Sequence, residues 1–353
     1  MEHAVWSGRG DRHRGARRRS AARRACACVV LLALAAAGAA GQNLKFASLA
    51  PKDTLWDKAL QQIGAEWHRL SGGDIEVTVF PGGVAGDETD MLRKMRTGQL
   101  DVAAISAIGL ASVYPGVLAL GMPFLFENEE EVAHATERLR PLIEEEFERR
   151  GFKILMWTAA GWVYFFSREP TLTPSDLQRQ KLNVPDADPG VVAAWQAAGF
   201  RIAEVPATEL MLGLQTGLVD AVLNTPLIVA PMQWFGVAKH MNALEIAPFY
   251  GAMLISTRTW RRFPEELRAQ FVAVVQEIGT EATAEVLEAE RIAVELMRRF
   301  GLTIHEPTAE QAAEWRVLQQ GFEPMVGPVV DERAFEVVVE ALAEYRAGRA
   351  ASP

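Results

Sequence analysis

The segment KLNVPDADPGVVAAWQAAGFRIAEVPATELMLGLQTGLVDAVLN, residues 181–224, alternates strand-like and helix-like runs. KLNVP, FRIAEVP and LVDAVLN are short, apolar and typical of buried strands. PGVVAAWQAAG and ATELMLGLQTG have helical composition, and each ends at a glycine, a common helix terminator. Strands that alternate with helices through short connections favour a mostly parallel sheet with helices on both faces.

The same alternation occurs earlier in the chain. Four runs are strand-like, NLKFASLA, DIEVTVFPGG, QLDVAAIS and FKILMWTAA, and GWVYFFS adds another strand at the start of the later series. Helices are expected at TLWDKALQQIGAEWHRLSGG, DETDMLRKMRTG and residues 128–150. The two series together predict an α/β protein with two lobes. A chain of 353 residues, 49% of them hydrophobic, is long enough to fill two cores.

One long helix is predicted near the end of the chain. Between Pro264 and Phe300 there is no further proline and only one glycine, Gly279, and apolar residues recur at helical spacing. A continuous helix here would be roughly 50 Å long, so we expect it to span both lobes. Two more helices are expected at about 308–320 and 331–346. The predicted boundaries are 42–160 plus 250–290 for the first lobe and 161–249 plus 291–353 for the second.

The first 41 residues are typical of a secretory signal peptide. An Arg-rich start is followed by an apolar run too short to span a bilayer comfortably, and then by small residues. Cleavage is expected between Ala39 and Gly41, with export to the periplasm. Cys26 and Cys28, the chain's two cysteines, both lie in this segment. The mature protein should therefore have no disulfide and no Cys-ligated metal.

The charge distribution argues against a nucleic-acid partner. The first 41 residues carry eight Arg against Glu2 and Asp11, a net charge of +6. Because the whole chain carries −9, the remainder carries about −15. A strongly acidic surface repels phosphate backbones.

The sequence gives no support for catalysis, a metal or a cofactor. His68, His134, His240 and His305 are scattered, with no pair at metal-ligand spacing. There is no GxSxG sequence and no phosphate-binding glycine loop. An enzyme on this fold would need a catalytic constellation that the sequence does not show, so we predict a protein that is not an enzyme.

Several aromatic and amide side chains lie at predicted strand ends. Trp157, Val163, Asn183 and Asn224 all lie within or at the ends of strands. In open α/β sheets, ligands bind in the crevice at the carboxyl ends of strands. Core packing is the ordinary role of any single aromatic residue, but the grouping of these residues across two lobes predicts a binding cleft.

The order of these segments resembles a known family. The signal, the run from Leu44 to Ser106, LGMPFLFENEEEV, PSDLQRQKLNVP, ATELMLGLQTGLVDAVLNTP and the late long helix resemble DctP-type solute-binding proteins of tripartite ATP-independent periplasmic (TRAP) transporters. The resemblance runs from about Asn43 to about Glu306. It implies a two-lobed periplasmic binding protein (type II-like) that delivers a small solute to an ion-gradient-driven membrane permease.

The resemblance also identifies where this chain departs from the family. Most members bind carboxylates through an Arg at the position of Asn183, and a second Arg is common at the position of Val163. The family often has an aromatic residue that packs on the substrate just ahead of the LQTG helix, and Ala207 occupies that position here. The family also has a polar residue after the strand that follows this helix, and this chain keeps one there, Asn224. Without a cation, burying a carboxylate here would cost several kcal/mol, so a neutral or hydrophobic ligand is expected.

The resemblance and the strand-end pattern together predict one set of ligand-binding residues: Trp56, Phe124, Trp157, Val163, Asn183, Ala207, Asn224, Trp234 and Phe249. For Asn183, ligand binding and capping of the PDADPG turn remain open alternatives. A carboxylate receptor with a relocated cation, from Arg168, Arg179 or Lys181, is a second reading. A third is a ligand sensor for a membrane kinase. For members that lack the Arg, the resemblance also allows a helical-repeat periplasmic partner.

Overall fold

The computed structural model describes Met1, residues 41–184 and residues 189–350. Residues 2–40 of the predicted signal peptide and the Pro-Asp-Ala-Asp stretch at 185–188 lie outside the described residues. Within the part of the chain that is described, no helix combines the length and apolar character that a membrane span requires.

A ten-stranded sheet runs through the whole molecule, in the order β2-β1-β3-β9-β4-β7-β5-β6, and β8 pairs with both β4 and β10. The strands are β1 (Gln42–Ser48), β2 (Ile75–Phe80), β3 (Val102–Ser106), β4 (Phe152–Ser167), β5 (Lys181–Asn183), β6 (Arg201–Ala203), β7 (Ala221–Asn224), β8 (His240–Asn242), β9 (Ala247–Ser256) and β10 (Thr303–His305).

The first lobe is formed by β1, β2 and β3 with α2 (Leu55–Leu70) and α3 (Glu88–Thr97). Its three strands are parallel, as the strand–helix alternation predicts. Local sequence fixes the helix ends: the Asp87 side chain accepts a hydrogen bond from the backbone N–H of Asp90, and Gly98 ends α3 with a φ of 76°.

The second lobe is formed by β5, β6, β7, β8 and β10 with four helices. Parallel pairing joins β5 to β6 and β7, and β8 to β10. The helices are α6 (Pro174–Gln178), α7 (Pro189–Ala197), α8 (Leu210–Thr216) and α9 (Pro226–Val229), with the 3-10 turn η2 (Trp234–Gly236) after them.

The two lobes are joined by β4 and β9, which we call the crossing pair. These strands run antiparallel to each other and to every other neighbour in the sheet. The sheet is therefore parallel within each lobe but antiparallel at its centre, where a mostly parallel sheet was expected. FKILMWTAA and GWVYFFS, expected as two strands, form the single strand β4, with an irregularity between Ala159 and Trp162.

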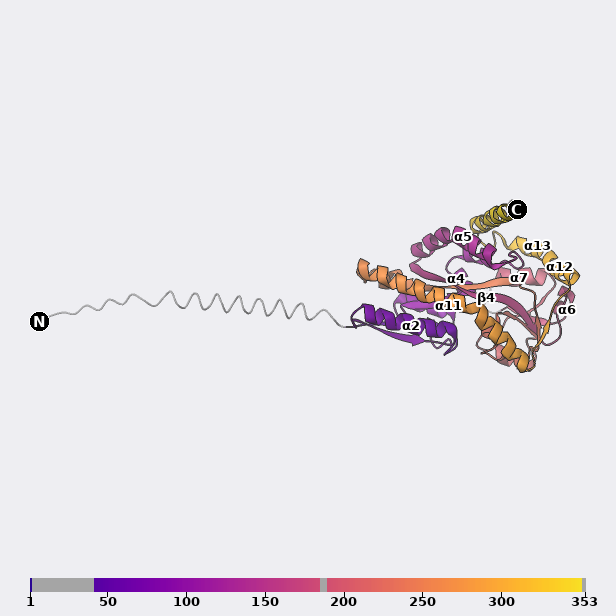
Figure 1. Cartoon of the computed structure of the whole chain (residues 1–353), viewed down its shortest axis with the longest axis horizontal. Coiled ribbons are helices and arrows are strands. Elements are labelled where there is room, and N and C mark those ends of the chain that lie inside the picture. The colour runs from indigo at the N-terminus through magenta and orange to yellow at the C-terminus, as the bar shows by residue number, and fades with distance from the viewer. Residues whose placement is uncertain (2–40, 185–188, 351–353) are drawn as a thin grey trace.

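The long helix is confirmed. It is α11 (Glu265–Arg299), which contacts α2 in the first lobe, the crossing strand β4, and α9 in the second lobe. Figure 1 shows α11 extending along most of the folded part of the molecule, across β4. Both ends follow local signals, since Pro264 precedes the helix and Gly301 follows it with a φ of 102°.

The remaining helices cover the crossing pair and the second lobe. Here α14 (Glu332–Ala350) packs against α5 (Glu129–Arg149) and η1 (Pro115–Gly121). The predicted lobe boundaries assigned these elements to different lobes, and those boundaries stay a prediction. The other short elements are α4 (Ala107–Ala111), α10 (Thr257–Trp260), α12 (Ala309–Val317), α13 (Gln319–Phe322) and η3 (Glu323–Met325).

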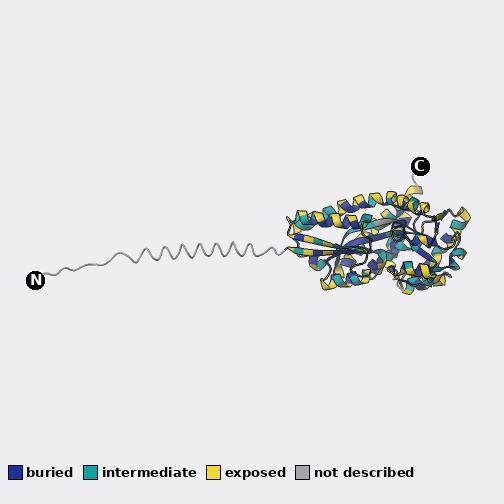
Figure 2. Cartoon of the chain, turned by 90° about the horizontal axis from the view of Figure 1, so that it is seen from below, coloured by how far each residue is buried: buried dark blue, intermediate teal, exposed yellow. Residues whose placement is uncertain are grey.

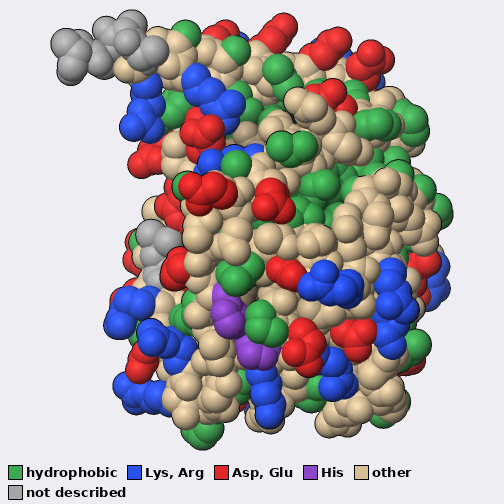
Figure 3. Space-filling model, turned by 90° about the vertical axis from the view of Figure 1, so that its right-hand side faces the viewer, with side chains coloured by type: hydrophobic (Ala, Val, Ile, Leu, Met, Phe, Trp, Pro, Cys, Tyr) green, Lys and Arg blue, Asp and Glu red, His purple; other side chains and the backbone are tan. Residues whose placement is uncertain are grey.

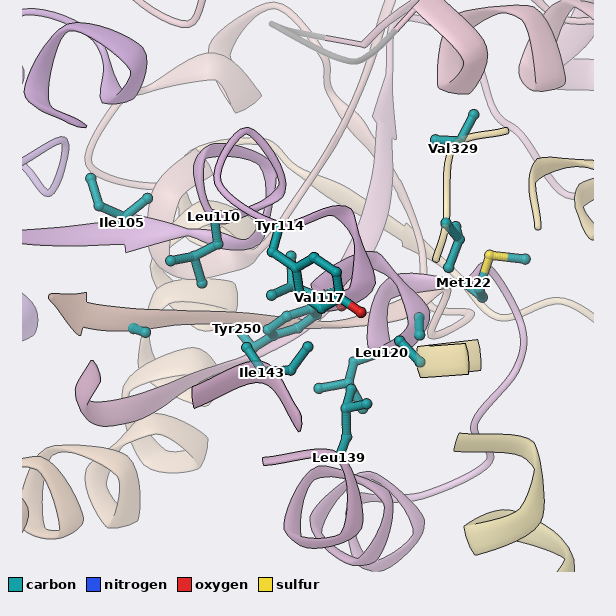
Figure 4. Close-up of a cluster of buried hydrophobic side chains, with 14 of the residues drawn as sticks. Ile105, Leu110, Tyr114, Val117, Leu120, Met122, Leu139, Ile143, Tyr250 and Val329 are labelled. Atoms are coloured by element: carbon teal, nitrogen blue, oxygen red, sulfur yellow. The ribbon is translucent and has the colours of Figure 1, made fainter. Parts of the chain in front are cut away.

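Three apolar cores hold these layers together. In Figure 2 the buried residues lie on the inner faces of helices and along the sheet, while the outward helix faces are exposed. The largest core joins α5, α14 and η1 to the crossing pair, and Tyr250 of β9 lies among its apolar side chains in Figure 4. The buried Tyr250 hydroxyl donates a hydrogen bond to the backbone carbonyl of Val117, which satisfies the polar end of the ring.

Candidate functional site

Two of the predicted site residues lie on the crossing strand β4. Trp157 pairs with Ala252 and Val163 with Ala247 of β9. Between them the strand is irregular, and Gly161 adopts a φ of 78°, which favours glycine. Trp157 is half-buried and Val163 is buried, and they lie on the strand that links the two lobes.

Asn183 is buried at the end of β5, with 1% of its surface exposed. Its Nδ2 donates hydrogen bonds to the backbone oxygens of Ala203, at 3.1 Å, and Val205, at 3.0 Å. Both amide N–H groups are therefore used to join β5 to β6 and the chain that follows it. This arrangement supports a structural role for the amide nitrogen, whose two partners among the described residues lie at the end of β6 and just after it. Residues 185–188 of the PDADPG turn lie outside the described residues.

Substituting Asn183 by alanine should lower the free energy of unfolding by about 1–3 kcal/mol, because it removes both donors from buried carbonyls. Asn224→Ala is the matched control. The Asn224 oxygen accepts one hydrogen bond, from the adjacent Thr225 N–H at 2.9 Å, and the residue is half-buried. Urea unfolding should show the larger loss for Asn183→Ala. Equal losses would contradict the strand-joining role.

Asn224 and Ala207 lie near the carboxyl end of the second-lobe sheet. Asn224 ends β7 and pairs with Tyr164 of β4, so it lies one position from Val163 on the partner strand. Ala207 is half-buried in the connection between β6 and α8. Asn224 lies at the end of a strand, as predicted, and the register places it beside the crossing strand. Its ligand-binding role stays a prediction.

Three buried neutral groups near these strand ends make no hydrogen bond to any described residue. They are Ser48 Oγ at the end of β1, Trp157 Nε1 on β4, and Thr225 Oγ1 just after β7. The pairings Ser48–Ala104, Ala104–Met253 and Met253–Met156 put Ser48 in the row of Met156, three strands from β4. Because side chains alternate along a strand, Ser48 and Trp157 face opposite sides of the sheet. A buried polar group without a partner needs an explanation, and a bound ligand is one. Ser48 and Thr225 were not among the predicted site residues.

The other predicted residues are more dispersed. Trp234 is 2% exposed and belongs to the second-lobe core. Phe124, with a φ of 61°, packs its ring 6.1 Å from that of Trp315 and lines a cavity of about 390 Å³. Trp56 is half-buried on α2 and Phe249 half-buried on β9. Their ligand-binding roles stay predictions.

The three cations proposed as replacements for the missing Arg are already engaged. Arg168 donates to the backbone oxygen of Leu214 and lies 3.6 Å from Asp220, while Lys181 donates to the Gly217 carbonyl and lies 3.7 Å from the same carboxylate. Arg179 pairs with Asp176 at 2.6 Å. These contacts hold the second lobe together and give each cation a structural partner.

Carboxyl groups, in contrast, gather around the crossing strand. The Tyr164 hydroxyl lies 3.4 Å from Glu245 Oε1 and donates to it. Burial raises the pKa of Glu245, and Glu129 raises it further. Burial, with Glu245 and Glu129, also raises the pKa of Glu290 to about 7. The potential around Tyr164 therefore opposes a second negative charge.

Charges of both signs occur on the face of the molecule seen in Figure 3, where acidic and basic side chains are interspersed. Two histidines lie side by side there, and His240 Nδ1 is 2.9 Å from His305 Nε2. In the described part of the chain, no group of three or more His, Cys, Asp or Glu side chains is arranged to hold a metal ion.

The family model of bacterial extracellular solute-binding protein family 7, the DctP family, matches residues 46–322. The chain belongs to this family. The match covers both lobes, the crossing pair, and all of α11. Family 7 proteins of the TRAP type are periplasmic receptors that bind small molecules and pass them to membrane permease subunits, and they are not enzymes.

Two relatives of this family 7 protein are similar to it over more than two thirds of its length. A solute-binding protein of Roseobacter denitrificans is 28% identical over 245 residues, 69% of this chain and 74% of the relative. The 2,3-diketo-L-gulonate-binding periplasmic protein of Escherichia coli is 24% identical over 279 residues, which are 78% of this chain and 84% of the relative.

Solved structures confirm the fold. A TRAP periplasmic solute-binding protein from Sulfurospirillum deleyianum, with bound succinate, superposes with a TM-score of 0.78 at 20% identity, covering 85% of this chain and 98% of the other. A TRAP periplasmic solute-binding protein from Xanthobacter autotrophicus, with bound β-D-galacturonate, superposes with a TM-score of 0.77 at 22% identity. The match covers 85% of this chain and 99% of the other.

Proposed function

We propose that this family 7 receptor binds a neutral, largely apolar small molecule between its lobes, next to the crossing pair, and delivers it to a TRAP-type permease. The main support is three uncharged buried groups at or near the strand ends that make no hydrogen bond to a described residue, Ser48 Oγ, Trp157 Nε1 and Thr225 Oγ1. Neutral donors and acceptors orient a neutral ligand at little desolvation cost.

The charges near the crossing strand support the same proposal. A buried carboxylate ligand requires a cation or several hydrogen-bond donors, since an unpaired buried charge costs several kcal/mol. Arg168, Arg179 and Lys181 are engaged elsewhere, and Glu245 would repel an anion, as would Glu290 once it ionises. A neutral ligand avoids both costs.

A carboxylate ligand is the second candidate. It is favoured by the succinate and the β-D-galacturonate bound in two structurally similar proteins. In this reading a cation other than Arg168, Arg179 and Lys181 would approach the site as the lobes close. A helical-repeat periplasmic partner stays a prediction under either reading.

The deciding experiment is to purify the chain from residue 42 natively, denature it, and identify the released small molecules by mass spectrometry. A neutral compound present at about one per protein would support the proposal. A stoichiometric dicarboxylate or sugar acid would contradict it. If nothing is released, thermal-shift screening follows, with succinate and galacturonate set against neutral amides, esters and lipids, and stabilisation by the acids alone would also contradict the proposal.

A variant pair then tests the site itself. Trp157→Phe keeps an aromatic ring but removes the Nε1 donor, so it should weaken binding of the identified ligand about tenfold, the effect of one lost hydrogen bond. Trp67→Phe is the control, because Trp67 Nε1 also makes no hydrogen bond to a described residue, but its ring is packed in the first-lobe core between α2 and α11. If the two variants bind equally well, Trp157 does not donate to the ligand.

A further inference from the structure

Glu290 lies where the long helix meets the irregular part of the crossing strand. It is on α11, has 8% of its surface exposed, and lies near the backbone N–H of Trp162, which lowers the pKa of this carboxyl group less than burial raises it. The contact with β4 is close, because a Cβ added to Gly161 would come 2.0 Å from Glu290 Oε1. The carboxyl group is thus packed against the point where β4 passes from one lobe to the other.

Few interactions in the structure would stabilise a negative charge on this carboxyl group. Oε1 is buried and has no hydrogen-bond partner among the described residues, and within the same residues Glu290 forms no ion pair. Arg291 and Arg298 line a cavity of about 460 Å³ together with Glu290, but Arg291 pairs with Glu288 instead, at 2.7 Å. An ionised carboxylate in this position carries a desolvation cost that a neutral carboxyl group avoids.

The charged and titratable groups around Glu290 come from four elements. From its own helix, Arg291, Glu295 and Arg298 line the cavity, with Glu295 paired to Arg299 at 3.1 Å. Tyr164 comes from β4, Glu245 from the segment before β9, and Glu129 from the first turn of α5. Glu245 and Glu129 are acidic and oppose ionisation of Glu290.

We propose that Glu290 is a proton-dependent contact between α11 and β4, which holds the long helix against the crossing strand when protonated and loosens that contact when ionised. The device would make the junction between the lobes more mobile as pH rises. The inference goes beyond the proposed ligand, and its test uses ligand-free protein, so either proposal can fail without the other.

The sign of the pH effect follows from linkage. Burial raises the pKa of Glu290 to about 7, above the ordinary value of 4.5 that it regains when the contact opens. The stabilisation is complete below about pH 4.5 and is lost as pH rises through about 7. Opening of the contact should therefore become about tenfold or more frequent between pH 5.5 and 7.5.

Hydrogen exchange measured by mass spectrometry at pH 5.5, 6.5 and 7.5 tests this, with rates corrected for the intrinsic effect of pH. In the wild type, peptides covering residues 158–166 should exchange about tenfold faster at the highest pH. Glu290→Gln, which is neutral at every pH, should abolish this rise. Glu288→Gln, an exposed change two residues away on the same helix, should retain it. Wild-type behaviour in Glu290→Gln would overturn the proposal.

A second variant keeps the test decisive if Glu290→Gln folds poorly. Glu245→Gln leaves Glu290 in place but removes a neighbouring negative charge that opposes its ionisation. The pH at which residues 158–166 become mobile should then shift downwards. An unchanged midpoint in this variant would contradict the proposal, as would exchange that does not depend on pH in the wild type.

Discussion

Replacement of Gly161 by alanine is expected to lower the free energy of unfolding by about 2–5 kcal/mol. An L-residue at a φ of 78° costs about 1–2 kcal/mol in backbone strain. The new methyl group would also lie 2.0 Å from Glu290 Oε1 and 2.2 Å from its Cδ, so the buried Glu290 side chain, or the helix that carries it, must shift. Overpacking of this kind costs about 1–3 kcal/mol.

Two controls separate strain from overpacking. Gly217 has a similar φ of 72°, with nothing within 4 Å of an added Cβ, so Gly217→Ala should show the strain cost alone. Combining Gly161→Ala with Glu290→Ala removes the obstructing carboxyl group and should recover the overpacking part, as a double-mutant cycle would show. If Gly161→Ala is no worse than Gly217→Ala in urea unfolding, the close approach of α11 to β4 is absent in solution.

Trp67→Ala should be comparably severe, with a loss of about 3–5 kcal/mol. Trp67 is fully buried on α2, and its ring stacks on Phe271 of α11 at a centroid distance of 4.2 Å and an angle of 9°. It also meets Phe46 of β1 edge-on at 5.4 Å. The substitution would open a cavity where a helix, a strand and the long helix meet, with little prospect of collapse.

Two control substitutions test whether the loss of stability comes from the buried ring of Trp67. Trp67→Phe should be much milder, because the Trp67 Nε1 makes no hydrogen bond to a described residue and only part of the ring volume is lost. Trp56→Ala, on the same helix but half-buried, should also cost less. A Trp67→Ala protein as stable as Trp56→Ala would show that α2 and α11 do not pack through this ring.

Much of the fold could be predicted from local patterns. The expected long helix, 264–300, differs by one residue at each end from α11, Glu265–Arg299, because proline and glycine mark both boundaries. The direction of the strands and their order in the sheet could not be predicted from the local sequence. APFYGAMLIS is a continuous apolar run, and periodicity cannot show that it inserts antiparallel between β3 and β4. Pairing partners far apart in the chain leave no local signature.

The site was harder to predict for a related reason. The partners of Asn183 are backbone oxygens of β6 and the chain after it, and only the register between neighbouring strands brings them together. Glu290, however, did leave a signal. It occupies an otherwise apolar stripe of the long helix with Val286, Ala293 and Met297, all buried. A carboxylate at such spacing indicates either a paired charge or a shifted pKa.

The position of β9 between β3 and β4 has a consequence for the order in which the chain can fold. The edge of β3 stays open until β9 arrives, since Val102 pairs with Ile255. During that interval the partly built lobe presents unpaired backbone groups and an apolar face, the features that promote aggregation. Contacts so distant in sequence are also slow to form. The first lobe therefore cannot complete its sheet until β9 has been made, which comes after β5, β6, β7 and β8 of the second lobe.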